Sequence, residues 1–150
     1  MIANKKSIGM ADVQINVKLK LAALWVALMF LYVYADILSF FRPGHIEELT
    51  AGMMGPIPVT QAGLLSAAIL MAIPSVMVFL SLALPAQVNR WTNLLCGVLY
   101  TLVNISNLMG ESWAYYITAG VVEIVLTLLI IGYAWQWPQS AAAVADGNQA

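Results

Sequence analysis

Two carboxylates, Asp36 and Glu123, lie inside long apolar stretches of the chain. An ionisable side chain at the centre of a membrane helix costs about 2.5 to 3.5 kcal/mol on insertion scales, and it usually faces the interior of a helix bundle. Glu123 is near the middle of its stretch, and Asp36 is nearer the end of its own. Because neither stretch contains lysine or arginine, we expect Glu123 to be a neutral acid that releases its proton when water or a cation reaches it.

Polar residues recur at helical spacing along the apolar stretches. Alternating steps of four and three residues place one stripe on the third stretch, formed by Asn93, Gly97, Tyr100, Asn104, Asn107 and Glu111. The first stretch carries a similar stripe that includes Tyr32 and Asp36. Together they predict a proton-binding or ligand-binding site made of Tyr32, Asp36, Tyr100, Asn104, Asn107 and Glu123. The alternative is that these side chains only join the helices by hydrogen bonds, each worth about 0.6 kcal/mol on average.

The other reactive residue types narrow the chemistry. The single cysteine, Cys96, lies in an apolar run, and the single histidine, His45, has no second histidine or cysteine nearby to complete a metal site. No nucleophilic side chain has an adjacent base. A net charge of -1 favours neither nucleic acid nor a strongly charged partner. We therefore predict a protein without enzymatic activity, cofactor, metal or nucleic-acid partner.

Long apolar helices must position the polar residues. The chain is 62% hydrophobic and 9% charged, whereas a soluble protein is about a quarter charged. A helix needs about 20 apolar residues to cross about 30 Å of hydrocarbon, and four stretches are long enough: 21–41, 61–84, 91–109 and 113–135. They predict an all-α fold, a four-helix transmembrane bundle. It would form a single domain over residues 1–150, with flexible tails at 1–15 and 138–150.

The basic residues predict how this bundle is oriented. Four lysines precede the first stretch and Arg90 follows the second, while Arg42 lies on the opposite side. Because lysine and arginine are retained on the cytoplasmic side, both termini of this multi-pass protein are predicted to be cytoplasmic. A cleaved signal peptide ending near Ala35 is the rival interpretation of the first stretch, but the apolar run continues to Phe41.

The longest connection and a proline within the second stretch are two further local features of the sequence. The longest connection, 42–60, contains either a short interfacial helix from His45 to Ala51 or a coil. Pro74 removes one backbone hydrogen bond from the second stretch. There we expect a static bend rather than a hinge, with the Ser75 hydroxyl at the freed carbonyl.

Three segments carry a resemblance to a known family. They are Lys18-Leu19-Lys20-Leu21 with Trp25, the run Tyr-Ala-Asp-Ile-Leu-Ser-Phe-Phe-Arg-Pro-Gly at 34–44, and the run Tyr-Thr-Leu-Val-Asn-Ile-Ser-Asn at 100–107. Over nearly its whole apolar region the chain resembles small bacterial four-span membrane proteins that are classified only as a domain of unknown function. The resemblance implies a bacterial cytoplasmic membrane location, and it implies no activity or ligand.

Two classes of function fit these observations. In the first, the chain is a small transporter or proton-coupled carrier, in which Glu123 and Asp36 bind a proton or a cationic solute in a polar pocket of the outer half. Four short spans enclose little volume, so a homo-oligomer would help to build a pathway. In the second, it is a non-enzymatic membrane module. Its polar residues only hold the helices of the bundle together, and its outer loop binds a partner. A solvent-reachable cavity shared by both carboxylates favours the carrier, and a dry core in which an asparagine caps each favours the module.

Overall fold

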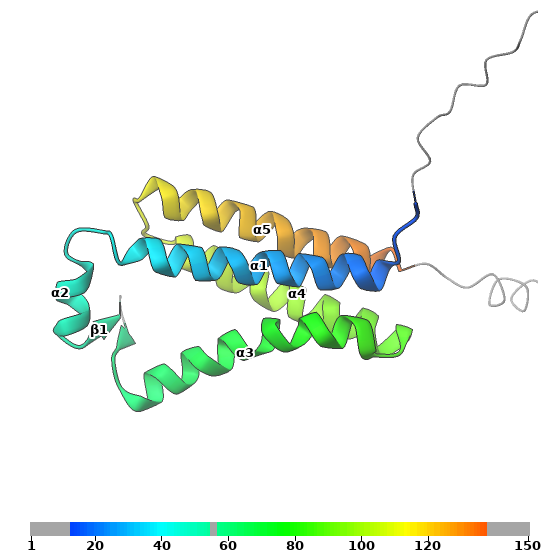
Figure 1. The fold of residues 1–150 in the computed structure, drawn as a ribbon, viewed down its shortest axis with the longest axis horizontal. Coiled ribbons are helices and arrows are strands. Elements are labelled where there is room, and N and C mark those ends of the chain that lie inside the picture. The colour runs from blue at the N-terminus through cyan, green and yellow to red at the C-terminus, as the bar shows by residue number, and fades with distance from the viewer. Residues whose placement is uncertain (1–12, 55–56, 138–150) are drawn as a thin grey trace, which may run out of the picture.

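The chain forms five helices and one short hairpin within the residues that the structure, a computed structural model, describes: 13–54 and 57–137 (Figure 1). Four of the helices are long, α1 (Val17–Ser39), α3 (Gln61–Ala83), α4 (Ala86–Leu108) and α5 (Ala114–Trp135). The short helix α2 (His45–Thr50) precedes the antiparallel strands β1 (Met53–Met54) and β2 (Ile57–Pro58). The predicted all-α class is therefore confirmed. The predicted tails fall almost wholly outside the described residues.

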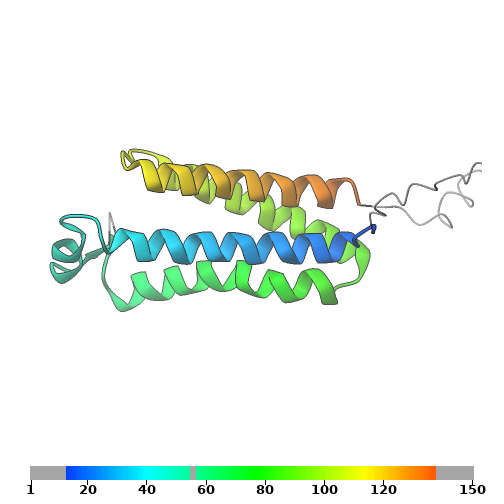
Figure 2. The same cartoon turned by 45° about the horizontal axis from the view of Figure 1, so that its top comes forward.

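Successive long helices run in opposite directions, as Figures 1 and 2 show. Helix α1 packs against both α3 and α5, and α5 also packs against α4. The described chain enters α1 and leaves α5 at one end of the bundle, which we call the terminal end (residues 13–20, 82–90 and 133–137). The opposite end, which we call the α2 end, comprises residues 36–61 and 106–116.

The long helices differ from the predicted stretches chiefly where they begin. Helix α1 starts at Val17 because the Asn16 side chain accepts a hydrogen bond from the Lys18 N–H at 2.9 Å, which caps the helix ahead of the apolar run. Helix α4 starts directly after Pro85, five residues before the predicted stretch. Hydropathy marks only the apolar part of a helix, whereas caps and prolines decide where the helix itself begins.

Three of the long helices are long and apolar enough to cross a membrane, namely α1, α3 and α5. Helix α4 is as long as α1 and α3, but several of its positions are polar. Asn89, Asn93 and Asn104 are fully buried on its inner side, while its exposed side chains include Leu95 and Leu102. These three asparagines of α4 therefore face the other helices.

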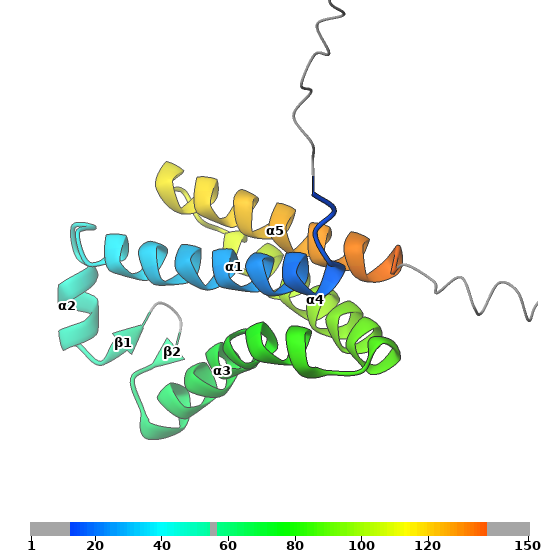
Figure 3. The same ribbon diagram turned by 45° about the vertical axis from the view of Figure 1, so that its right-hand side comes forward.

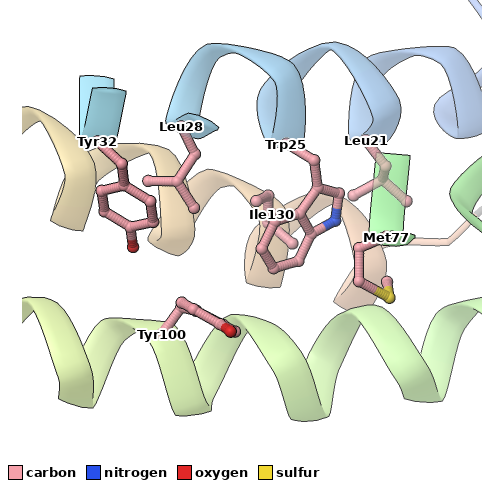
Figure 4. Packing of buried hydrophobic residues seen from close by; sticks show 7 residues of the cluster. All are labelled: Leu21, Trp25, Leu28, Tyr32, Met77, Tyr100 and Ile130. Carbon is pink, nitrogen blue, oxygen red and sulfur yellow. The ribbon is translucent and has the colours of Figure 1, made fainter. Parts of the chain in front are cut away.

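The core lies between α1 and the other three long helices, and Figure 4 shows its seven central side chains. Trp25 and Tyr100 are fully buried and meet edge to face, with ring centroids 5.9 Å apart. Where α4 meets α5, glycine allows close contact between the two helices. A Cβ atom at Gly97 would lie 2.8 Å from Cγ1 of Ile131, and one at Gly120 would lie 2.5 Å from Cδ2 of Leu108. Only residues without a side chain fit at these two crossing points.

Pro74 lies inside α3, where the helix bends (Figure 1). Proline has no N–H to donate to the carbonyl four residues earlier, which belongs to Leu70. The Tyr100 hydroxyl of α4 donates a hydrogen bond to that carbonyl. The Ser75 hydroxyl, which we expected at this position, donates instead to the Met71 carbonyl at 2.9 Å. A side chain from the neighbouring helix thus compensates for the missing bond.

The connection between α1 and α3 is helical in its first part, which decides between the two alternatives for this loop. Helix α2 begins after Gly44, whose φ of 85° reverses the chain. The hairpin follows α2 at the same end of the bundle, as Figure 3 shows. In this hairpin, Met53 of β1 pairs with Pro58 of β2, and Met54 pairs with Ile57. Helix α2 and the hairpin together stand over the end of the bundle where the candidate site opens.

Candidate ligand site at the α2 end

An open cavity of about 680 Å³ lies at the α2 end, and we call it the α2-end cavity. Its polar lining residues are Asp36, Ser39, Arg42, His45, Glu48, Ser106, Asn107, Glu111, Ser112 and Tyr116. Its other lining residues are Phe40, Leu49, Met54, Met109 and Gly110. The ends of α1, α4 and α5 thus meet α2 around a space within the size range of small-molecule pockets, about 300 to 1,000 Å³.

An ion pair closes one side of this cavity. Arg42 Nη1 lies 3.4 Å from Glu111 Oε2, and the guanidinium stands over the Trp113 ring at 5.3 Å from its centroid. The other oxygen of Glu111 accepts hydrogen bonds from the Trp113 and Ser112 N–H groups, at 3.0 Å and 2.7 Å. The Trp113 N–H in particular holds the pKa of Glu111 below its usual range. Glu111 is therefore ionised at neutral pH, and it is the ion-pair partner of Arg42.

The pairing of charges leaves Asp36 as the available acid on the cavity wall. His45 and Glu48 form the other ion pair found among the described residues, at 3.8 Å. Arg42 is occupied by Glu111. Asp36 forms no ion pair with any described residue, although its side chain borders the cavity. A positively charged group entering the cavity would meet this carboxylate.

Beneath the cavity, Tyr32, Asn104 and Glu123 form a buried polar group that we call the inner cluster. The Tyr32 hydroxyl donates to Asn104 Oδ1 at 2.7 Å. A hydrogen bond of 2.9 Å between the Thr101 and Thr127 hydroxyls fixes the register of α4 against α5. One turn from that bond toward the α2 end, Asn104 therefore stands at the level of Glu123. Three different helices supply the cluster.

The inner cluster has unused hydrogen-bonding capacity. Asn104 is fully buried, and its Nδ2 atom has no hydrogen-bond partner among the described residues. Exchanging the two amide atoms would only leave the oxygen in the same position. Glu123 is 6% exposed, and no described side chain forms an ion pair with it. Most buried polar groups in proteins have a partner, so the Asn104 amide leaves the inner cluster with N–H donors available to an acceptor such as a water or a carboxyl oxygen.

The two predicted carboxylates, Asp36 and Glu123, are close enough to interact electrostatically. Asp36 acts electrostatically on Glu123, and both carboxylates act on Tyr116, which borders the cavity about two helical turns before Glu123. Asn107 also lines the cavity. Of the six predicted site residues, Asp36 and Asn107 line the α2-end cavity, whereas Tyr32, Asn104 and Glu123 form the inner cluster. The sixth, Tyr100, lies near Tyr32, but its hydroxyl is bonded to the Leu70 carbonyl.

A second polar network near the terminal end was only partly foreseen. Asn93 Oδ1 accepts hydrogen bonds from the Trp25 indole N–H at 2.8 Å and from the Ser81 hydroxyl at 3.3 Å. Asn93 Nδ2 donates to Asn89 Oδ1 at 2.6 Å, and Asn89 Nδ2 donates to the Ser81 carbonyl at 2.6 Å. Asn89 precedes the apolar run, but its spacing of four from Asn93 would have placed it on the same stripe. This network is fully paired, which distinguishes it from the inner cluster.

The part of the chain that the structure describes gives no indication of a metal-binding site. There, no three residues among histidine, cysteine, aspartate and glutamate come together as a metal-binding group. Asp36 and Glu123 are two carboxylates, with tyrosine and asparagine as their polar neighbours. The site is therefore better suited to a proton or to a cation with hydrogen-bonding groups than to a tightly held metal ion.

The fold and the site define a helical bundle compatible with a membrane protein, with three helices apolar enough to span and a polar cluster in its interior. The chain belongs to a family of unknown function (DUF6326), which matches residues 10–144. The resemblance to an uncharacterised family is thus confirmed. No curated protein and no solved structure matches the chain, so its function must be argued from the site.

Proposed function

We propose that this chain is a four-span protein of the bacterial cytoplasmic membrane, and that it binds and carries a cationic solute in exchange for a proton. The solute would enter the α2-end cavity, and Glu123 of the inner cluster would bind the proton. The protein would act without a resident cofactor and without bond-breaking chemistry. This proposal rests chiefly on the unpaired Asn104 amide beside Glu123, beneath a cavity that has Asp36 in its wall.

The exposed side chains of α4 support a fourth span. Its outward positions are large and apolar, and include Leu95 (71% exposed), Leu102 (60%) and Ile105 (46%). Three residues that lower its mean hydropathy, Asn89, Asn93 and Asn104, are buried and have partners inside the bundle. The exposed Gln87 and Asn107 lie near the two ends of the helix. Lipid contacts only the outward face of a helix, so buried polar residues in α4 do not prevent it from spanning.

The distribution of charge supports an orientation with the terminal end in the cytoplasm. Lys18, Lys20 and Arg90 lie at this end, and no acidic residue accompanies them among the described residues 13–20, 82–90 and 133–137. The α2 end carries Arg42, which is paired with Glu111. Lysine and arginine favour the cytoplasmic side of a span. The α2-end cavity would then open to the outside.

This orientation predicts which positions a thiol reagent can reach in intact cells. In a chain carrying Cys96→Ala, Glu48→Cys on α2 should react with a membrane-impermeant maleimide before the cells are opened. Gln136→Cys, also exposed but at the terminal end, should react only after permeabilisation. The reverse pattern would overturn the orientation. Labelling of both positions in intact cells would contradict a terminal end that lies wholly in the cytoplasm.

The walls of the α2-end cavity favour an organic cation over a bare inorganic one. Phe40 and Tyr116 offer aromatic rings to a positively charged group. Met54 and Met109 are flexible apolar residues that adapt to irregular shapes. Asp36 supplies the opposing charge. An inorganic ion would use the carboxylate and leave the apolar walls without a role.

Binding of a probe cation tests the proposed site. Tetraphenylphosphonium should bind the purified chain in detergent, and Asp36→Asn should weaken the affinity about tenfold because a charge-assisted contact is lost. Glu47→Gln removes a similar charge from an exposed α2 position outside the cavity lining, and should leave the affinity unchanged. Isothermal titration calorimetry measures both. Equal affinities for the parent and Asp36→Asn, or competition by sodium alone, would contradict an organic-cation site.

A membrane module that only holds a partner is the second candidate function, and the terminal-end network favours it. The bonds among Trp25, Ser81, Asn89 and Asn93 have the form of structural contacts between helices. In such a module Glu123 would also be structural. The inner cluster distinguishes the two candidate functions. Side chains that only join helices are expected to have all their hydrogen-bonding groups paired, whereas the Asn104 amide has no partner among the described residues.

A further inference from the structure

The terminal end of the bundle carries positive charge that no described acid balances. Lys18, Lys20 and Arg90 lie there, and the described residues 13–25, 81–95 and 127–137 contain no aspartate or glutamate. Two of these cations are engaged within the chain. Lys18 Nζ donates to the Leu84 carbonyl at 2.7 Å and so caps the end of α3, while Arg90 lies near the Trp91 and Trp135 rings.

Lys20 is the cation whose head group makes no hydrogen bond at all among the described residues, whereas Lys18 and Arg90 each make at least one. Its ammonium stands over the Tyr133 ring, 5.1 Å from the centroid. It forms no hydrogen bond or ion pair with another residue in the described parts of the chain. Contact with an aromatic face leaves the three N–H donors of an ammonium available to an anion.

Lys20 also borders a second cavity, of about 610 Å³, between the start of α1 and the end of α5. Gln14 and Gln136 line it with amide groups, and Val13, Ile15 and Val17 line it with apolar side chains. Val13 is 79% exposed and Ile15 is 54% exposed. The cavity thus combines one ammonium, two amides and an apolar wall, and it opens at the level where a spanning bundle meets lipid headgroups.

We propose that this second cavity binds the headgroup of an anionic phospholipid. Lys20 would bind the phosphate, with Gln14 and Gln136 as further donors. The positive end of the α1 helix dipole adds to the attraction. The exposed apolar residues would contact the glycerol and the first acyl carbons, a contact that a free phosphate ion does not offer. This inference rests on the proposed placement of the bundle in a membrane, but neither on the proposed transport activity nor on the orientation of the protein.

Lipid binding to the full chain tests this inference. We expect dioleoyl phosphatidylglycerol to bind the detergent-solubilised chain at least tenfold more tightly than dioleoyl phosphatidylcholine, as measured by native mass spectrometry. Lys20→Gln should weaken phosphatidylglycerol binding about fivefold, the effect of one basic residue near an anionic headgroup. Lys20→Arg should retain it. Arg42→Gln, which removes a cation from the α2 end, is the matched control and should not change it.

Three results would overturn this inference. The first is equal binding of the two lipids by the parent chain. The second is an equal loss of phosphatidylglycerol binding in Arg42→Gln and Lys20→Gln, which would indicate attraction by net charge alone. The third is displacement of the lipid by millimolar inorganic phosphate, which would identify a site for the free ion. Thermal melting of each variant shows whether a loss of lipid comes from unfolding, and Lys20→Arg provides the folded comparison.

Discussion

Replacing Glu123 by glutamine is expected to abolish proton-coupled flux while the bundle stays folded. Glutamine keeps the size and the hydrogen-bonding groups of the neutral acid, but it cannot release a proton. Glu123 is 6% exposed and has no ion-pair partner among the described residues, so the substitution leaves no opposite charge behind. Proteoliposomes containing a pH-sensitive dye should show proton efflux when tetraphenylphosphonium is added outside, and the signal should be absent with Glu123→Gln.

Matched variants separate transport from folding in this experiment. Glu47→Gln should retain the flux, since Glu47 lies on exposed α2 and outside the cavity lining. Glu123→Ala should lose the flux and also melt earlier, because it leaves a cavity beside the buried Tyr32 and Asn104. Flux that persists in Glu123→Gln, together with early melting of Glu123→Ala, would make Glu123 purely structural. An infrared band of a protonated carboxyl that disappears in Glu123→Gln would confirm the neutral acid directly.

Replacing Asn93 by leucine is expected to cost about 2 to 3 kcal/mol of stability, the range for leaving buried polar groups unpaired. Asn93 receives hydrogen bonds from Trp25 and Ser81 and donates one to Asn89. Leucine has the same number and branching of side-chain heavy atoms, so the substitution leaves no void, and the loss would come chiefly from the unpaired groups. Thermal or denaturant unfolding in detergent measures the change.

Asn104 and Asn107 are the matched controls for Asn93, since all three lie on α4. Asn104 is as buried as Asn93, but one of its amide atoms has no partner. Asn104→Leu should therefore cost less stability than Asn93→Leu. Asn107→Leu changes an exposed residue and should stay within about 0.5 kcal/mol of the parent. Equal losses for Asn93→Leu and Asn104→Leu would show that both are structural contacts and would remove the main support for a ligand site.

The number and position of the long helices could be predicted from apolar length alone. The sequence also indicated which residues of α4 face inward, because Asn93 and Asn104 are eleven residues apart, which is about three helical turns. It could not indicate which of them has a full set of partners. That difference depends on Asn89, one turn away on α4, and on Ser81 of α3, which reaches Asn93 only because the tight turn between α3 and α4 brings the two helices together.

Tyr100 shows why a shared stripe does not define a site. Its spacing places it between Asn93 and Asn104, and we grouped it with the ligand-binding residues for that reason. Its hydroxyl instead bonds the carbonyl freed by Pro74, on the neighbouring helix α3. Predicting this bond requires the distance between two helices, whereas sequence periodicity describes only one helix at a time.

The bond between Tyr100 and Leu70 bears on how the protein is made. A helix that enters a bilayer with an unsatisfied carbonyl is costly, because lipid offers no donor. Helix α3 has such a carbonyl until α4 supplies the Tyr100 hydroxyl. Only Leu84 and Pro85 separate the two helices. We therefore expect the insertion machinery to release α3 and α4 as a pair, with α3 held beside the protein channel until its partner has been synthesised.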